Sequence, residues 1–516
     1  MTKLTPFSRA GLGCMTAFMM VSSHGSEREQ LETLRQTTVN LIQALVQQNV
    51  LTQEKADLII RQAEAKAVET VAAQKKAEEG VVRVQYVPES VRKQITDQVR
   101  EEVVAQAKAE RWGDANAVPE WTDRLRWDGD VRFGYQLDRF ADGNAPEFFH
   151  QVSGQNVSNT LEDRNRLRVR ARLRMTARIT QDVAATVRFV TGGLTDPVST
   201  NQTLGQTGAK YGFALDRVFL RARSRTFLPW LTASAGRVPN PFFSTNLVWD
   251  DDLNFDGAAL QASPPLDDRR QWRPFGTLGV FPLQDIESSA AVKAKSKWLL
   301  AAQAGLEWAP DYDTNAKIGL AIYDFRNISG IRNDFQQTAF NRTAPDFRQK
   351  GNTLFNIANT NPVTSLFALA SDFRLLNLTG TVDLNLFDPV QVMLSGDYVK
   401  NIGFSRAKTL ARTGAALDAD TKGYMGQVAV GMPMMENRGD WQLSLGYRRL
   451  GADAVPDAFT DSDFHLGGTN HKGFFVGAQY GLARNVWLNA RWMSSNEIRG
   501  LPLSIDVFQV YLNARF

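Results

Sequence analysis

Arginine recurs at every second position over one short stretch of the chain. The stretch reads Arg-Leu-Arg-Val-Arg-Ala-Arg-Leu-Arg, and its arginines are Arg166, Arg168, Arg170, Arg172 and Arg174. Alternate side chains of an extended strand point to opposite faces, so these guanidinium groups would share one face and the apolar residues the other. Rows of arginine along a pore attract anions and repel cations, so the pattern favours an anion filter.

A second stretch has the same alternation of arginine with apolar residues. The arginines expected on its inward face are Arg217, Arg221, Arg223 and Arg225. Arg188 lies on an intervening apolar stretch and would extend the patch between the two rows. The plainer interpretation is that carboxylates neutralise the arginines, and Asp128, Asp130 and Asp138 on the preceding stretch are available for this.

The elements that must position these side chains are strands. A period of two runs through residues 126–516, where for example Val131 and Phe133 alternate with Arg132 and Gly134. Strands with one apolar and one polar face fit either a soluble sandwich or a membrane barrel. The periodicity therefore predicts a mostly β protein and leaves these two architectures open.

The lengths of the links between strands favour the barrel. Short links such as Thr180–Asp182, Phe387–Pro389 and Leu482–Asn485 alternate with long ones such as Arg326–Ser371 and Gly451–Asn470. Short turns on one side and long loops on the other are typical of outer-membrane barrels. The links predict about sixteen antiparallel transmembrane strands, an even number that returns the chain to its starting side, and leave open whether the longest loop enters the lumen.

Composition excludes two other classes. Outside the extreme N-terminus no run approaches the roughly 18–20 apolar residues of a membrane-spanning helix, which excludes a helical membrane protein. Lysine and arginine number 59 against 55 acidic residues, a net charge of only +4. A nucleic-acid partner is not expected, because such binders concentrate a basic excess in one patch.

The chain offers few residues that could act in catalysis or bind a metal ion. The lone cysteine, Cys14, lies in the expected leader, so the mature chain offers no thiol nucleophile and no cysteine ligand. A barrel-borne hydrolase would need a histidine base, but His150, His465 and His471 fall in or beside expected loops without an evident serine or aspartate partner. We expect no enzyme activity, no metal and no cofactor.

The first part of the chain has a different pattern. Residues 1–25 read as a secretory signal peptide, with a short apolar stretch after Lys3 and Arg9. Residues 26–112 are predicted to be helical and periplasmic, and the leucines of their first helix recur at coiled-coil spacing. Another copy of the same segment is the expected partner, which favours a homotrimer; one solvated helical hairpin is the plainer alternative.

The last strand carries a further signal. Phe508, Val510, Leu512, Ala514 and Phe516 alternate onto one face, and the chain ends on the aromatic residue. A terminal alternating strand that ends in phenylalanine resembles the signal by which the outer-membrane assembly machinery selects its clients. Phe516 is therefore the candidate assembly signal.

Three further stretches carry a family resemblance. They are Val82–Glu89, Leu125–Tyr135 and Gly236–Gly257. With the terminal strand, they make the chain resemble the putative porins of Gram-negative bacteria that have a helical N-terminal extension. The resemblance implies a pore-forming, trimeric barrel in the lipid of the bacterial outer membrane, with residues 126–516 as the barrel, but it implies no particular solute.

The third long loop, Val238–Asp256, contains the candidate constriction residues. In general porins the third extracellular loop folds inward, and acids on it face basic residues of the wall. The corresponding acids here are Asp250, Asp251, Asp252 and Asp256. A transverse field across a constriction is the preferred mechanism, and exposure of the acids to water outside the pore is the plainer one. Residues 252–257 copy the opening of a calcium loop, but Ser263 stands where that loop needs glutamate.

These patterns together predict passive diffusion of small hydrophilic solutes with a preference for anions. A structural anchor that tethers the envelope through the N-terminal helices is the main alternative, and a hydrolase is the second. Removing Glu27–Lys108 would separate trimerisation from tethering.

Overall fold

The computed structural model describes residues 122–147, 159–264, 271–290 and 293–516, together with Arg61, Lys66 and Val99, each in a helix. The chain divides into two compact units, Met1–Glu120 and Trp121–Phe516. The expected signal peptide (1–25) lies outside the described residues, as does the expected helical segment (26–112) apart from these three positions. The fold below is that of the second unit.

The second unit is a closed antiparallel barrel of sixteen strands. They are β1 (Leu125–Phe140), β2 (Arg164–Arg178), β3 (Val183–Val190), β5 (Ala214–Ala222), β6 (Leu231–Pro239), β7 (Asn254–Ala262), β8 (Trp272–Gln284), β9 (Lys297–Trp308), β10 (Thr314–Arg326), β13 (Arg374–Phe387), β14 (Val390–Asn401), β15 (Lys422–Gly431), β16 (Trp441–Leu450), β17 (His471–Ala483), β18 (Val486–Glu497) and β19 (Ser504–Arg515). Each pairs with the next, and β19 closes on β1 with Arg515 opposite Asp130. The predicted strand number is confirmed.

The remaining strands belong to loops. β4 (Gln202–Thr203) joins the edge of β2 through Thr203, opposite Arg168. β11 (Leu354–Asn356) and β12 (Phe367–Leu369) form a separate two-stranded sheet. The one α-helix of the described barrel unit, α5 (Arg406–Thr413), begins after Ser405, whose side chain accepts from the Lys408 backbone N–H.

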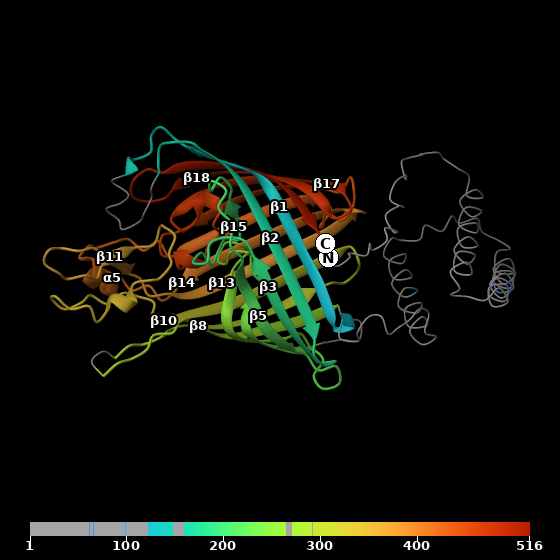
Figure 1. Cartoon of the computed structure of the whole chain (residues 1–516), viewed down its shortest axis with the longest axis horizontal. Coiled ribbons are helices and arrows are strands. Elements are labelled where there is room, and N and C mark those ends of the chain that lie inside the picture. Colours follow the sequence, from blue (N-terminus) through green and yellow to red (C-terminus); the bar gives the residue numbers. More distant parts are fainter. Residues whose placement is uncertain are drawn as a thin grey trace, which may run out of the picture. The chain divides into compact units, whose positions relative to one another are not determined.

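Links at the two ends of the barrel differ in length (Figure 1). At the end where β1 starts and β19 finishes, which we call the terminal end, the links are short, as at 179–182 and 484–485. At the opposite loop end they are mostly longer. In chain order the loop-end links are L1 (141–163), L2 (191–213), L3 (240–253), L4 (285–296), L5 (327–373), L6 (402–421), L7 (451–470) and L8 (498–503).

Alternation along the strands separates an apolar outer face from a polar inner one. On β16, Leu443 and Leu445 are 56% and 57% exposed, whereas Arg448 is 2% exposed. Exposed large apolar side chains recur on the outer face of every long strand, an arrangement that suits lipid and not water. The soluble-sandwich alternative is therefore excluded. No helix among the described residues is long and apolar enough to cross a membrane.

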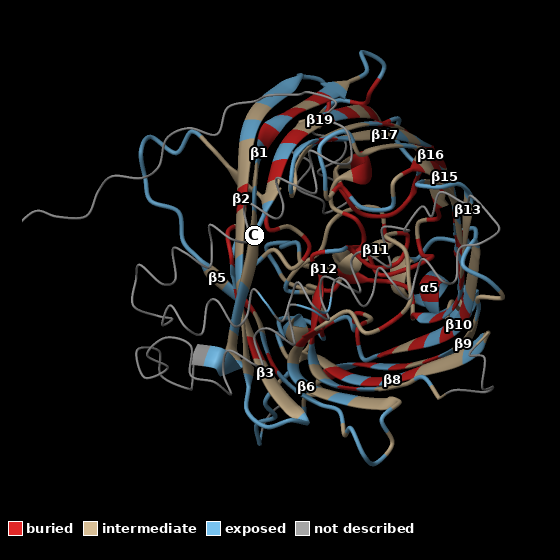
Figure 2. Cartoon of the chain, turned by 90° about the vertical axis from the view of Figure 1, so that its right-hand side faces the viewer, coloured by how far each residue is buried: buried red, intermediate tan, exposed pale blue. Residues whose placement is uncertain are grey.

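Loop segments occupy part of the barrel interior, and many of their residues are buried (Figure 2). Trp249 of L3 packs against Tyr323 of β10 and Phe459 of L7, in a buried cluster that also contains Phe281 of β8. A segment of L5 also enters, because its Phe347 and Lys350 line a cavity together with the inward-facing Asp138 of β1. The question left open by the sequence has an answer: part of the longest loop lies inside the lumen.

Candidate functional site

The five arginines predicted to share a face lie on β2 and point into the lumen. Each has a carboxylate within 4 Å. The N–O distances are 2.6 Å from Arg166 to Asp138, 3.7 Å from Arg168 to Asp463, 2.8 Å from Arg170 to Asp130, 2.7 Å from Arg172 to Asp130 and 2.6 Å from Arg174 to Asp128. The row is therefore a row of ion pairs, the arrangement that the neutralisation alternative requires.

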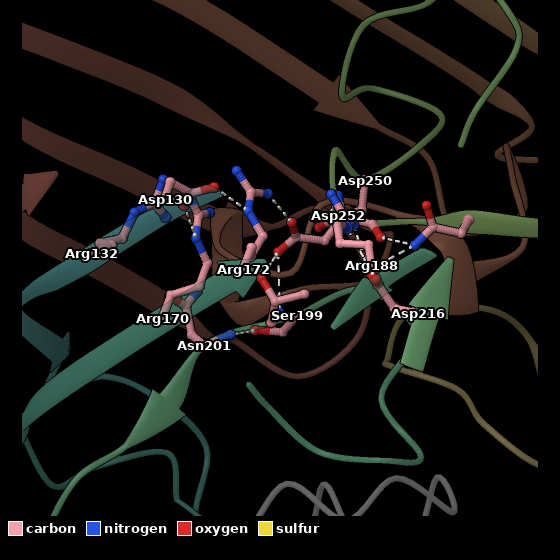
Figure 3. A network of polar contacts seen from close by, with 12 residues as sticks. Asp130, Arg132, Arg170, Arg172, Arg188, Ser199, Asn201, Asp216, Asp250 and Asp252 are labelled. Atoms are coloured by element: carbon pink, nitrogen blue, oxygen red, sulfur yellow. Dashed lines mark hydrogen bonds and ion pairs between the residues drawn. The ribbon is translucent and has the colours of Figure 1, made fainter. Parts of the chain in front are cut away.

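Strand register explains most of this pairing. β1 and β2 are antiparallel neighbours, with Asp128 opposite Arg174 and Asp130 opposite Arg172. Both strands alternate with the same period, so inward acids of one strand meet inward arginines of the other. Asp130 accepts from Arg170 as well as from Arg172, and the contacts continue from Arg172 to Asp252 (Figure 3).

A second group of charges lies on β3 and β5. Arg188 is 6% exposed and makes a two-pronged contact with Asp216 through Nε, at 2.9 Å, and Nη2. The register between β3 and β5 shifts between Arg188 and Phe189, so Asp216 and its neighbour Arg217 both face inward. Arg217 donates from Nε to Asn254 at 2.6 Å and has no carboxylate partner among the described residues.

The predicted pore-lining role is corrected for two arginines of this stretch. β5 ends at Ala222, and Arg223 and Arg225 lie exposed in the turn that follows. Arg223 donates to the Pro229 carbonyl, and the Arg225 backbone N–H donates to Asp182 in the neighbouring turn. The sequence-based prediction extended the alternation of inward and outward residues past Ala222, where the chain turns. Arg221 remains on β5, with its guanidinium 5.7 Å from the ring of Phe219.

L3 crosses the lumen and is bound to several walls. Gln303 of β9 accepts from the Phe243 N–H and donates to the Phe243 carbonyl, at 2.8 and 2.7 Å. Thr245 donates to Asp397 of β14 at 2.7 Å. Asn246 accepts from Arg448 of β16 at 2.6 Å. These contacts hold the loop across the barrel interior.

The consecutive acids of L3 have different surroundings. Asp252 forms an ion pair with Arg172 at 3.1 Å and accepts two hydrogen bonds from Thr200 of L2. Asp250 accepts from the Ser462 N–H of L7 at 2.9 Å. Asp251 is exposed and has no ion pair among the described residues. Because Arg172 and Asp252 touch, no field across open water forms between them, and Asp251 is the L3 acid that remains for such a role.

Burial and neighbouring charges shift the pKa values of these loop acids. Burial, together with Asp461 and Asp252, raises the pKa of Asp250 well above its usual range. Asp251 faces the lumen water, but the protein around it in the lumen removes part of its hydration, and this, together with Asp461 and Asp252, raises its pKa as well. Burial also opposes ionisation of Asp252, but Arg172 and Arg170 outweigh it and lower the pKa of that carboxyl.

Asp256 is not part of the constriction. It lies on β7, where its side chain is on the exposed outer face and pairs with Arg237 of β6 at 2.9 Å. Asp252 and Asn254 are buried on the inner side, so the three side chains of the calcium-loop pattern do not converge. Among the described residues no group of three or more histidine, cysteine or acidic side chains could hold a metal ion.

The histidines expected in loops occupy closed positions. His465 Nδ1 lies 2.9 Å from Ser495 Oγ, a contact that no sequence pattern indicated. Both residues are 1% exposed, and the serine hydroxyl donates to the Ile505 carbonyl. The pair is therefore closed to substrate and its hydroxyl proton is already committed. His471 is also 1% exposed, and His150 lies outside the described residues.

Sequence reasoning missed several charged lumenal residues. Arg132 follows from the same alternation as Asp130, and Lys317 from the alternation of β10. The Lys317 ammonium lies 4.6 and 4.5 Å from the ring centroids of Phe243 and Phe275. Asp463 of L7 pairs with Arg168, and no local signal indicated this, because the two are joined only by the return of a distant loop.

Comparison with known proteins gives one family and several solved structures. The model of a family described as "Putative porin" matches residues 35–516. No curated protein matches the chain. The outer membrane channel DcaP of Acinetobacter baumannii is 11% identical, with 76% of this chain and 97% of that chain covered and a TM-score of 0.40. OmpF of Salmonella typhi in complex with daunomycin is 11% identical, with 76% of this chain and 97% of that chain covered and a TM-score of 0.39. A loop-deletion mutant of OmpT of Vibrio cholerae is 11% identical, with 76% of this chain and 99% of that chain covered and a TM-score of 0.38.

Proposed function

The chain belongs to the family of putative porins, and we propose that this outer-membrane porin lets small hydrophilic solutes diffuse passively with a preference for anions. The terminal end of the barrel then faces the periplasm and the loop end faces the outside, as the short turns and long loops of such barrels do. The observation that carries the anion preference is a group of inward cations without carboxylate partners.

Arg132, Arg217 and Lys317 are three of these wall cations. Arg164 of β2 and Arg221 of β5 also form no ion pair among the described residues. Arg132 of β1 donates to Asn513 at 2.9 Å, with its guanidinium 5.0 Å from the Tyr511 ring. Arg217 is bound to an amide oxygen, and Lys317 lies between two aromatic rings. A bonded ion pair cancels most of its own field at a distance, whereas an unpaired charge acts on ions in the lumen. On the acid side, neither Asp250 nor Asp251 of L3 forms an ion pair among the described residues, and Asp251 is the exposed one.

The paired arginines have a different role in this proposal. The Arg172–Asp252 contact fixes the distance between L3 and the β2 wall. Together with the attachments of L3 to β9, β14 and β16, it holds the loop in one position and so sets the width of the passage. Selectivity by size then depends on the braced loop, and selectivity by charge depends on the unpaired cations.

Liposome swelling tests passive diffusion directly. Purified protein in liposomes should admit small sugars and organic anions at rates that fall with solute size. At equal size, an anion should enter faster than a neutral sugar. Equal impermeability to all solutes, from protein whose folding has been checked, would contradict the proposal.

A homotrimer is the proposed assembly. Alanines 222, 233, 235 and 258 gather on the outer face of β5 to β7 and line a shallow groove, where a second barrel could approach more closely than over large side chains. Native mass spectrometry of the detergent-extracted protein should give three copies. Deletion of Glu27–Lys108 should yield monomers if those helices trimerise; trimers that have lost attachment to the envelope would favour the tether instead.

A further inference from the structure

A cavity of about 390 Å³ lies at the loop end of the arginine row. Its walls are β1, β2 and β19 together with parts of L1, L2, L5, L7 and L8. It is separate from the acids of L3, none of which lines it. We call it the vestibule pocket.

One side of the vestibule pocket is basic. Arg164, Arg166, Arg168 and Lys350 line it, against the carboxylates of Asp138 and Asp196. Arg168 is also paired with Asp463 of L7, so an excess of one positive charge remains when Asp196 is ionised. Asp138 is bound to Arg166 at 2.6 Å. Burial raises the pKa of Asp196, so its negative charge is disfavoured.

Two of these cations have no carboxylate partner among the described residues. The exposed Arg164 side chain makes no ion pair or hydrogen bond. Lys350 donates from Nζ only to the carbonyl oxygens of His465 and, at 3.0 Å, Gly467. Burial lowers the pKa of Lys350 to about 8, so the ammonium remains mostly protonated at pH 7.

The opposite side of the pocket is apolar. Its lining includes Phe140, Phe347, Leu466, Leu503 and Ile505. The last two are 2% exposed and Phe347 packs against the buried core, so this wall is rigid. A chloride ion would use the basic side alone and leave the apolar wall in contact with water.

The segment that carries Lys350 is held in place by L7. Gln349 donates to the carbonyls of Asp457 and Thr460 at 2.9 and 2.8 Å. Gly351 has a φ of +106°, and a Cβ there would lie 2.3 Å from the Thr469 carbonyl oxygen, so glycine permits the close approach. Lys350 is therefore positioned before any ligand arrives, which lowers the entropic cost of binding.

We propose that the vestibule pocket binds an organic anion with an apolar body, such as an aromatic carboxylate, before it passes the L3 constriction. The carboxylate would contact Arg164 and Lys350, and the ring would lie against the wall that contains Phe347. The volume lies within the range of small-molecule sites, and guanidinium and ammonium groups are strong partners for carboxylates. This inference rests on the proposed function and names a solute class for it.

Isothermal titration of the full-length protein in detergent at pH 7 tests the pocket with three probes. Sodium benzoate has both the carboxylate and the aromatic ring. Sodium acetate lacks the ring, and benzyl alcohol lacks the charge. Benzoate should bind saturably and at least about tenfold more tightly than either of the others. Equal affinity for benzoate and acetate would overturn the role of the apolar wall and indicate a general anion site.

Variants assign the binding to this pocket. Lys350→Met and Arg164→Gln should each weaken benzoate binding about tenfold, and Phe347→Ala should weaken benzoate but not acetate. Arg164 is exposed, so Arg164→Gln keeps the test valid if Lys350→Met fails to fold. Arg484→Gln removes the same charge from an exposed turn at the terminal end and should change nothing. Unchanged benzoate affinity in Arg164→Gln would overturn the proposal.

The titration is independent of conduction, so two failures can be told apart. Swelling and anion preference without benzoate binding would leave the diffusion proposal standing and remove the pocket. Benzoate binding that needs Arg164, in a protein that admits no solute, would support the pocket and contradict the diffusion proposal.

Discussion

At the scale of single residues, pairing decides which lumenal charges act on a passing solute. Arg174 and Asp128 are in contact at 2.6 Å, and from a distance the pair is nearly neutral. Arg132 is bound to a neutral amide and keeps its full field. The number of arginines on a strand is therefore a poor measure of its selectivity, and the partners of each one must be known.

Replacing a bonded pair by a neutral pair tests this point. The double variant Asp128→Asn/Arg174→Gln removes one charge of each sign, so the chloride-to-potassium permeability ratio should stay within about twofold of the native value. The single variant Arg174→Gln leaves Asp128 unpaired and should lower the ratio. A double variant that loses as much anion preference as the single one would show that paired arginines do act as the filter.

The acids of L3 predict a dependence on pH. The pKa values of Asp250 and Asp251 are raised, so acidification protonates them before ordinary aspartates, which titrate near pH 4. Negative charge leaves the lumen, and the chloride-to-potassium ratio should rise as pH falls. The lowered pKa of Asp252 keeps its contact with Arg172 over the same range.

Thermodynamic linkage between proton binding and folding gives the sign of the pH effect on the free energy of unfolding. A carboxyl with a raised pKa binds its proton more tightly in the folded protein, so acidification through that pKa stabilises the fold. Reversal potentials at pH 7, 6 and 5 measure the effect on selectivity, and Asp250→Asn/Asp251→Asn should make the ratio depend less on pH in this range. A native ratio that does not change, or that falls on acidification, is the contrary result.

Residue-level prediction from the sequence succeeded where strands are regular and failed at their ends. The period of two placed the arginines of β2 on one face together with the acids of β1. It also assigned Arg225 to the wall, although β5 ends at Ala222. Contacts such as Arg168 with Asp463 of L7 depend on a loop that returns from far along the chain, and no local pattern encodes them.

At the scale of elements, Trp249 is the most buried aromatic anchor of L3, beside Phe242 and Phe243. Trp249 is 2% exposed, and its ring lies 5.0 Å from both Tyr323 and Phe255. Trp249→Ala should cost about 3–5 kcal/mol of unfolding free energy and release the loop from the wall. Because the strand pairing does not involve this ring, the barrel should still form.

The expected readouts are a lower temperature of heat modification on gels and larger, noisier single-channel currents. Tyr312→Ala provides the aromatic control, because Tyr312 is fully exposed in the turn between β9 and β10. A quiet channel of native conductance from Trp249→Ala would contradict the role of L3 as the constriction.

Strand number was predictable because both turn length and periodicity are local properties. Which loops fold into the lumen could not be predicted in the same way. L5 and L7 read as ordinary extracellular loops, yet Gln349 of L5 binds L7 inside the barrel. Inward folding of a loop depends on a few long-range hydrogen bonds, which leave no periodic trace in the sequence.

At the scale of the whole molecule, the barrel closes at the last residue. Phe516 and Gly129 exchange two backbone hydrogen bonds of 3.0 Å, and the Phe516 side chain remains 65% exposed. A Cβ on Gly129 would lie 2.8 Å from the phenylalanine ring, so glycine leaves room for that ring. The terminal aromatic residue thus joins β19 to the start of β1.

Phe516→Ala should lower the amount of protein in the outer membrane several-fold, because the assembly machinery would recognise the terminal strand less well. Once refolded in detergent, the variant should behave as a normal barrel, since the backbone pairing is kept. Leu488→Ala, on the outward face of the neighbouring strand β18, is the control and should assemble normally. Native levels of Phe516→Ala would remove the assembly role of the last residue.

The most direct test of the account is the reversal potential of the purified protein in a planar bilayer under a potassium chloride gradient. We predict a chloride-to-potassium permeability ratio above one, which Arg132→Gln/Arg217→Gln lowers toward one. A cation preference of the native channel, or a ratio that these two substitutions leave unchanged, would contradict the claim that unpaired lumenal cations select the solute.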